Sequence, residues 1–145
     1  MEIALEEARA AQRRGEVPVG AVVLGPDGTL LARAGNRVEE KNAAAHAELL
    51  ALGAAARKLA APRLQGCDLF VTLEPCPMCA AATSLYRIRR LIFGAYDPKT
   101  GGVEHGPRIF ASPATHHRPE VVGGVLERDC AVLLKEFFAL RRAEP

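Results

Sequence analysis

The sequence predicts a three-layer α/β/α fold with a mixed sheet of five strands. Two features of the sequence lead to this fold class. Short apolar segments alternate with segments of helical periodicity, which is the pattern of a sheet covered by helices. The first two apolar segments are joined by a tight turn and should pair antiparallel, whereas helices separate the later ones, which favours parallel pairing. At 145 residues, the chain is long enough for one domain, residues 1–145, and too short to argue for two.

The composition is that of a folded protein, because 49% of the residues are hydrophobic and 25% are charged. The formal net charge of +2 is too small to indicate a polyanionic partner by itself, although it is compatible with a local basic patch. The N-terminal segment is charged and amphipathic, and the chain has no apolar run of about eighteen residues or more. We therefore expect a cytoplasmic protein that does not bind a membrane.

The first half of the chain predicts a helix, a hairpin and a second helix. Apolar residues recur at helical spacing over residues 2–14, and Gly15 ends the run. A valine-rich segment, residues 17–24, is followed by a Gly-Pro-Asp-Gly turn and by residues 29–34, as expected of two antiparallel strands. Residues 43–61 are rich in alanine and leucine and precede a proline, which is typical of a helix.

The second half of the chain predicts further strands and helices around one long loop. Compact apolar runs suit buried strands, and helical spacing returns after the first of them. A segment rich in Gly, Pro, His and Asp should be a functional loop. The strands are expected at residues 69–73, 90–95 and 121–122, the helices at residues 77–86 and 126–142, and the loop at residues 96–120, with one helical turn near Ile109.

A Cys-x-x-Cys pair at the start of a predicted helix is the first candidate site. Cys76 and Cys79 are three positions apart, so they share one face of the helix and can bind one tetrahedral metal ion. The positive end of the helix also favours thiolates over thiols. His46 opens the preceding helix, which argues against a thioredoxin-like redox pair, since such a pair needs no histidine partner. We expect these residues to bind one Zn²⁺ per chain.

A structural zinc site would need a fourth protein ligand, and the two other cysteines are the candidates. Cys67 precedes the buried strand that leads to Cys76, and a strand rises about 3.3 Å per residue, so Cys67 should lie far from the metal. Cys130 falls among apolar residues of the last helix, where a free cysteine is usually part of the core. The fourth position is therefore expected to be open to water, as in catalytic zinc sites.

Glu48 follows the zinc histidine by two residues and is the expected catalytic residue. An open position on zinc lowers the pKa of bound water to about 7. Glu48 is placed to take the proton of that water and to relay it, without binding the metal itself. Alone, a His-x-Glu sequence is usually an ordinary helix start, but its combination with Cys-x-x-Cys is a strong signal.

The two motifs resemble the signature of the cytidine and nucleotide deaminase superfamily. They read His46-Ala47-Glu48 and Thr72-Leu73-Glu74-Pro75-Cys76-Pro77-Met78-Cys79. Within that superfamily the chain is most similar to bacterial tRNA-specific adenosine deaminases, over nearly its whole length. The resemblance implies a cytidine deaminase-like fold, a homodimer, and hydrolysis of adenosine to inosine and ammonia at the wobble position of a tRNA anticodon loop. The narrower likeness lies in residues 16–21, Asn36, residues 93–95, Asp97, residues 99–101, 117–118, 137–138 and 141–142.

The same resemblance implies which residues contact the substrate. An asparagine side chain offers both a donor and an acceptor to the polar edge of a base, and Asn36 matches the residue that hydrogen-bonds the nucleoside. Aromatic and arginine side chains stack on splayed bases, while lysine contacts phosphate. One of Phe137 and Phe138 is expected in the core instead. The implied substrate-binding residues are Asn36, Ala47, Asp97, Lys99, Phe138, Arg141 and Arg142.

The chain departs from the family pattern in two places. The segment before the zinc histidine reads Asn42-Ala43-Ala44-Ala45, where the family usually has Asp-Pro-Thr-Ala, and its connection to Asn36 is one residue shorter. Tyr96 stands where an arginine is common. Both departures bear on RNA affinity more than on zinc chemistry.

Two other functions fit parts of the same pattern. The zinc motifs alone do not select the base, so a deaminase of a free base or nucleoside, of guanine or cytosine type, is the alternative enzyme. The aromatic and basic C-terminal residues argue against it, because a small base needs no such surface. A non-enzymatic RNA-binding module with structural zinc would require Cys67 or Cys130 as a fourth ligand.

Overall fold

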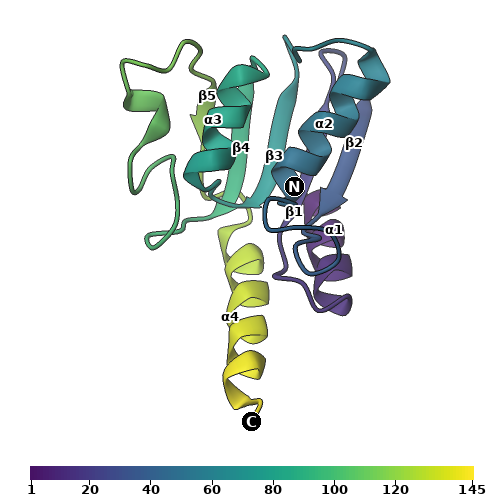
Figure 1. Cartoon of the computed structure of the whole chain (residues 1–145), viewed down its shortest axis with the longest axis vertical. Coiled ribbons are helices and arrows are strands. Elements are labelled where there is room, and N and C mark those ends of the chain that lie inside the picture. The colour runs from purple at the N-terminus through teal and green to yellow at the C-terminus, as the bar shows by residue number, and fades with distance from the viewer.

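Five strands form one mixed sheet in the order β2-β1-β3-β4-β5 (Figure 1). The computed structural model describes residues 1–145. β1 pairs antiparallel with both β2 and β3, and β3, β4 and β5 run parallel to one another. The mixed five-stranded sheet expected from the sequence is confirmed. The strands are β1 (Gly20–Leu24), β2 (Leu30–Gly35), β3 (Asp68–Leu73), β4 (Arg90–Ala95) and β5 (Glu120–Val122).

Helices cover both faces of the sheet, which completes the three layers (Figure 1). α2 (Ala47–Leu59) and α3 (Pro77–Leu85) pack together on one face. α1 (Glu2–Arg13) and α4 (Glu127–Ala143) pack on the other. A 3₁₀ turn, η1 (Ile109–Ala111), contacts α3 and confirms the helical turn expected in the long loop. No helix has the length and apolar character needed to cross a membrane.

The main core lies between the sheet and the α2/α3 layer. It is built from large apolar side chains of the central strands, among them Leu69, Leu91 and Phe93, all fully buried. α2 faces them with small residues such as Ala51 and Ala55, one turn apart, which lets the helix lie close to the sheet. A smaller cluster on the opposite face joins α1 and α4, and there Cys130 is buried as expected.

Two elements begin three or more residues later than the sequence predicts. β1 begins at Gly20 rather than at residue 17, because Pro18 has no N–H and the chain turns tightly there, with the Val19 N–H donating to the Val17 carbonyl (2.8 Å). α2 begins at Ala47 rather than at residue 43. The preceding segment is held in a turn by the side chain of Asn42, which accepts the N–H of Ala44 (2.9 Å).

The topology brings several chain segments to one edge of the sheet. β2 and β3 are each antiparallel to β1, so they point the same way, and β4 is parallel to β3. The carboxyl ends of these three strands therefore lie together, where Asn36, Glu74 and Tyr96 follow them. Ligand sites of open α/β sheets gather at this edge. α4 begins after β5 and extends beyond the same edge (Figure 1).

The close packing of α1 on β1 predicts that Gly20→Ala destabilises the protein. A Cβ at residue 20 would lie 1.9 Å from the Ala4 carbonyl oxygen and 2.6 Å from the Ala8 nitrogen, so α1 would have to move. We expect the free energy of unfolding to fall by about 3 kcal/mol or more. Gly53→Ala is the matched control, because a Cβ there meets only the flexible Arg57 side chain, at 3.4 Å, and should stabilise α2 by about 0.5–1 kcal/mol. Denaturant unfolding that gave both variants the same sign would contradict this packing.

Candidate zinc centre and active site

Two helix N-termini supply the candidate metal ligands. His46 immediately precedes α2 and Cys76 immediately precedes α3, both with extended backbone (ψ 147° and 168°). Pro77 occupies the first turn of α3, where the missing N–H of proline has no cost. Cys79 follows Cys76 by three residues, so the two side chains share one face of α3. Cys79 is fully buried.

The three side chains have the geometry of a tetrahedral zinc site. The Nδ1 atom of His46 lies 3.6 Å from the sulfur of Cys76 and 3.5 Å from the sulfur of Cys79, and all three atoms lie within 4.8 Å of one another. Zn–S bonds of about 2.3 Å and Zn–N bonds of about 2.0–2.1 Å at tetrahedral angles place nitrogen and sulfur about 3.6 Å apart. One zinc ion therefore fits between these ligands without rearrangement of the chain.

The structure offers no fourth protein ligand to this site. His46, Cys76 and Cys79 are the only group of His, Cys, Asp and Glu side chains close enough together to hold a metal. The thiol of Cys67 is buried before β3 and points to the Gln65 carbonyl (3.8 Å). Cys130 packs against β4 in the α1/α4 cluster. Neither cysteine therefore lies where it could complete the closed Cys₃His site considered from the sequence.

The electrostatics of the site favour a thiolate at Cys76. Hydrogen bonds from the Cys79 thiol and from His46 lower the pKa of Cys76 to about 4, although partial burial acts in the opposite direction. The position of Cys76 at the start of α3 adds the positive end of the helix dipole. Thiolate is the form that binds zinc, so the site is electrostatically suited to the metal.

Glu48 lies in the first turn of α2, two residues beyond the zinc histidine. The residue is only 4% exposed, and its burial raises the pKa of its carboxyl group to about 7. A carboxyl group with a pKa near neutrality can both take and give a proton, as a general acid and base must. The environment of Glu48 thus fits the relay expected from the sequence.

A cavity of about 460 Å³ opens above the metal ligands. This volume lies in the range of small-ligand sites. Part of its wall is apolar. These side chains come from β3 and from the segment just before β1, and they include Val17, Val19 and Leu73. The cavity also brings together most of the site residues expected from the sequence, namely His46, Glu48, Cys76, Asn36, Asp97, Phe138 and Arg141.

The orientation of the Asn36 side chain is set by the start of α2. Its Oδ1 accepts the backbone N–H of Ala47 at 2.8 Å, so the other end of the amide must be the NH₂ group. Asn36 lines the cavity, and the hydrogen bond through Oδ1 is the one that its side chain makes to the protein. Asn36 therefore presents a hydrogen-bond donor to whatever occupies the cavity, while its acceptor fixes the residue next to the zinc histidine.

Three of the expected substrate-binding residues do not line this cavity. Ala47 is fully buried, and its contact with the site is its backbone N–H, which donates to the Asn36 side chain. Lys99 and Arg142 are exposed outside the cavity. Asp97 does line it, but its carboxylate is occupied within its own loop, where it accepts the N–H groups of Lys99 (3.2 Å) and Thr100 (3.0 Å) and the Thr100 hydroxyl (2.6 Å).

α4 closes one side of the cavity with aromatic and basic side chains. Phe137 is buried, as expected for one member of the pair, while Phe138 is 44% exposed. The guanidinium of Arg141 lies 4.9 Å from the centre of the Phe137 ring and donates to the Gly15 carbonyl at 2.7 Å. Arg141 thus ties α4 to the end of α1 as well as bordering the cavity.

Sequence reasoning gave no role to two buried glutamates of the cavity wall. Glu16 accepts the backbone N–H groups of Glu39 (3.1 Å) and Glu40 (3.3 Å). Glu74 accepts N–H groups of a loop that begins at Asp97. Both glutamates lie in segments that carry the family resemblance, and that position was the only signal in the sequence.

This fold and this site together define the class of zinc-dependent nucleobase deaminases. Residues 1–95 match the cytidine and deoxycytidylate deaminase zinc-binding region. A tRNA-specific adenosine deaminase of Agrobacterium fabrum is 52% identical over 145 residues, which cover 99% of this chain and 95% of the relative. A solved structure from studies of A-to-I editing by tRNA:A34 deaminases at the wobble position of transfer RNA is 52% identical with a TM-score of 0.90, covering 92% of this chain and 97% of that chain. The chain belongs to the bacterial tRNA-specific adenosine deaminases, a branch of that zinc-binding family.

A more distant branch shares the fold. The guanine deaminase of Nitrosomonas europaea is 28% identical, with a TM-score of 0.81 over 95% of this chain and 82% of that chain. The lower identity distinguishes this branch from the tRNA-specific relatives. The resemblance to bacterial tRNA-specific adenosine deaminases, stated from the sequence, is thus confirmed.

The ligand geometry predicts that Cys79→Ala abolishes zinc binding. We expect purified Cys79→Ala protein to lose the single zinc ion that the unaltered chain binds, because two ligands do not hold the metal as three do. Cys67→Ala is a matched control, since both cysteines are fully buried, and it should keep its zinc. Native mass spectrometry measures both. Loss of zinc from Cys67→Ala would contradict the assignment of ligands.

Proposed function

We propose that this protein hydrolyses adenosine to inosine at the wobble position of a tRNA anticodon loop. The observation that carries this proposal is that two zinc ligands, His46 and Cys76, and Glu48 share one cavity with the aromatic and basic side chains of α4. In the reaction, the oxygen of water forms a bond to C6 of adenine, the bond from C6 to the exocyclic nitrogen breaks, and the nitrogen leaves as ammonia. A single-stranded anticodon loop can present a splayed base to such a cavity.

The residues around the cavity have separable roles in this reaction. His46, Cys76 and Cys79 would hold zinc, which when bound lowers the pKa of a water molecule to about 7 and so supplies a nucleophile at neutral pH. Glu48 takes one proton from that water and delivers it to the ring nitrogen of adenine. It then takes the remaining proton from the hydroxyl on C6, which becomes the carbonyl of inosine, and delivers that proton to the departing amine. The NH₂ group of Asn36 donates to the nucleoside, which orients the base over the catalytic residues.

We assign recognition of the RNA around the target base to residues at the rim of the cavity and just outside it. Phe138 exposes part of its ring beside the cavity, where a flanking base can stack on it. Lys99 and Arg142 are exposed outside the cavity, at positions suited to phosphates of the same loop. Asp97 shapes the loop that carries Lys99.

Two further features belong to this proposal. We infer a homodimer, for which the exposed side chains of Met78 (40%) and Leu85 (71%) on α3 offer an apolar contact surface next to the zinc centre. We also infer that the protein acts in the cytoplasm, where its tRNA substrate is found.

The role of Glu48 predicts that Glu48→Gln abolishes deamination without loss of zinc. The amide keeps the size of the side chain but cannot carry a proton, so kcat should fall at least about a hundredfold. Ammonia release from an adenosine-bearing anticodon stem-loop gives the rate, and metal analysis of the same sample gives the control. Turnover close to that of the unaltered protein would sink the proposed relay.

The substrate itself is tested by comparing classes of compound. The purified protein is incubated separately with the anticodon stem-loop, with free nucleosides and with free guanine and cytosine. We expect inosine in the RNA and no ammonia from the small molecules. Ammonia from guanine or cytosine, with the RNA unchanged, would support the free-base deaminase instead.

The positive charges of Lys99 and Arg142 should make a salt-dependent contribution to RNA binding. Lys99→Ala and Arg142→Ala should each weaken stem-loop binding and lower the slope of log affinity against log salt by about one, since each removes one phosphate contact. Lys58→Ala, at the exposed end of α2, is the control and should change neither. Equal salt slopes for all three variants in a filter-binding titration would rule out the assigned contacts.

A further inference from the structure

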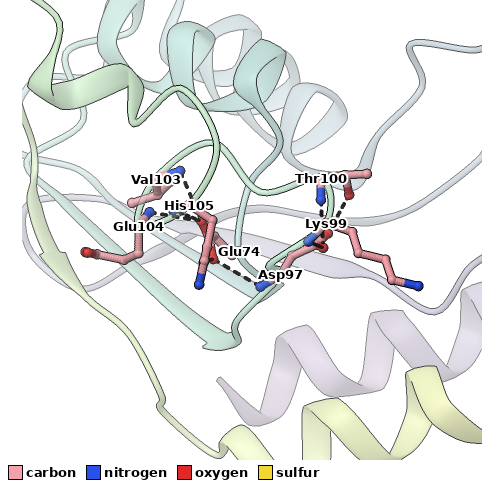
Figure 2. Close-up of polar contacts among 7 residues, drawn as sticks. All are labelled: Glu74, Asp97, Lys99, Thr100, Val103, Glu104 and His105. Atoms are coloured by element: carbon pink, nitrogen blue, oxygen red, sulfur yellow. Dashed lines mark hydrogen bonds and ion pairs between the residues drawn. The ribbon is translucent and has the colours of Figure 1, made fainter.

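We propose that Glu74 is a positioning residue that holds the 97–105 loop in the shape of a ready-made cavity wall. The carboxylate of Glu74 lies where β3 ends, between the two ends of this loop (Figure 2). The inference rests on the proposed function, because the loop borders the cavity in which the substrate nucleoside would bind.

Five N–H groups converge on this one carboxylate (Figure 2). Oε2 accepts the backbone N–H groups of Val103 (3.1 Å), Glu104 (2.9 Å) and His105 (3.1 Å). Oε1 accepts the backbone N–H of Asp97 (3.0 Å) and the ring Nδ1–H of His105 (2.8 Å). The Glu74 side chain is 0% exposed, so these donors replace the water that a buried carboxylate would otherwise require.

These contacts hold both ends of the loop at one point. The Asp97 N–H marks where the loop leaves β4, and the three consecutive N–H groups mark where it ends. Between them the loop is closed on itself, because the Gly101 N–H donates to the Asp97 carbonyl at 2.9 Å and the Asp97 carboxylate caps Thr100.

The loop contacts both the cavity and the segment that carries the zinc ligands. Asp97 and Thr100 line the cavity. A Cβ at Gly101 would lie 2.5 Å from Oε2 of Glu74, and one at Gly102 would lie 2.6 Å from the backbone of Pro77. The Gly102 N–H donates to the carbonyl of residue 75 at 2.8 Å. Glu74 therefore fixes the substrate-facing loop directly against the start of α3.

Holding the 97–105 loop in place should affect substrate binding more than the chemical step. A loop that is already ordered lets RNA bind without the free-energy cost of ordering it. Glu48 and the zinc ligands lie on α2 and α3 or immediately before them, and both helices pack on the sheet through the main core rather than through the loop. Loss of the Glu74 contacts should therefore raise KM and leave kcat nearly unchanged.

Glu74→Gln tests this proposal. The glutamine NH₂ cannot accept a hydrogen bond, so at least one backbone N–H of the loop loses its partner, and KM for the anticodon stem-loop should rise at least about fivefold. Hydrogen exchange should become faster at one or more of the four backbone amides that Glu74 accepts, those of Asp97, Val103, Glu104 and His105. Glu16→Gln is the matched control, because both glutamates are 2% exposed and both accept backbone N–H groups. It should release the amides of residues 39–40 and leave residues 97–105 protected.

Two measurements keep the outcome decisive if Glu74→Gln does not fold. In the unaltered protein the Glu104 amide should exchange slowly, although its side chain is exposed, and the Gly106 amide, which donates to no backbone carbonyl, should exchange fast. His105→Ala removes one of the five donors and should raise KM by a smaller factor. Unchanged KM and unchanged exchange in Glu74→Gln, or equal exchange of the two amides in the unaltered protein, would overturn the proposal. The exchange results are independent of the substrate, so failure of the proposed function would show separately, as absence of turnover in the unaltered protein.

Discussion

The site depends on the meeting of two helix N-termini at one edge of the sheet. His46 and Cys76 are the residues that precede α2 and α3, and their reactive atoms lie 3.6 Å apart. The sheet topology produces this meeting, because β2 and β3 point the same way and each is followed by one of these helices. Since each helix N-terminus carries a partial positive charge, a thiolate is stabilised there. The metal ligands, Glu48 and the cavity above them follow from this arrangement.

Buried carboxylates then fix the rim of the cavity. Glu16 and Glu74 would be unfavourable in the interior without partners, and both are satisfied by backbone N–H groups of loops that are distant in sequence. Asn36 acts in a related way, since its acceptor holds the start of α2 and its donor faces the cavity. The rim is therefore a set of loops tied to polar side chains at strand ends, and α4 closes the remaining side with Phe138 and Arg141.

The parts of the structure that depend on local spacing could be predicted from the sequence. Helical and strand periodicity predicted the order of the elements, and the spacing of Cys76 and Cys79 predicted two ligands on one helix face. His46 lies 30 residues from Cys76, and it was included because the two motifs occur together. The late start of α2 was missed because a side-chain turn at Asn42 competes with the helix. The role of Glu74 could not be predicted, since its partners lie 23–31 residues away and sequence patterns do not show where a buried acid finds its donors.

The central claim is that three protein ligands hold zinc and leave the fourth position open. X-ray absorption spectroscopy at the zinc edge of the purified protein tests it most directly. The structure predicts two sulfur atoms at about 2.3 Å, one imidazole nitrogen at about 2.0–2.1 Å and one further light atom that no protein side chain supplies. A shell with three sulfur atoms would mean that Cys67 or Cys130 completes a structural site, and it would contradict the account of this protein as a zinc-dependent deaminase.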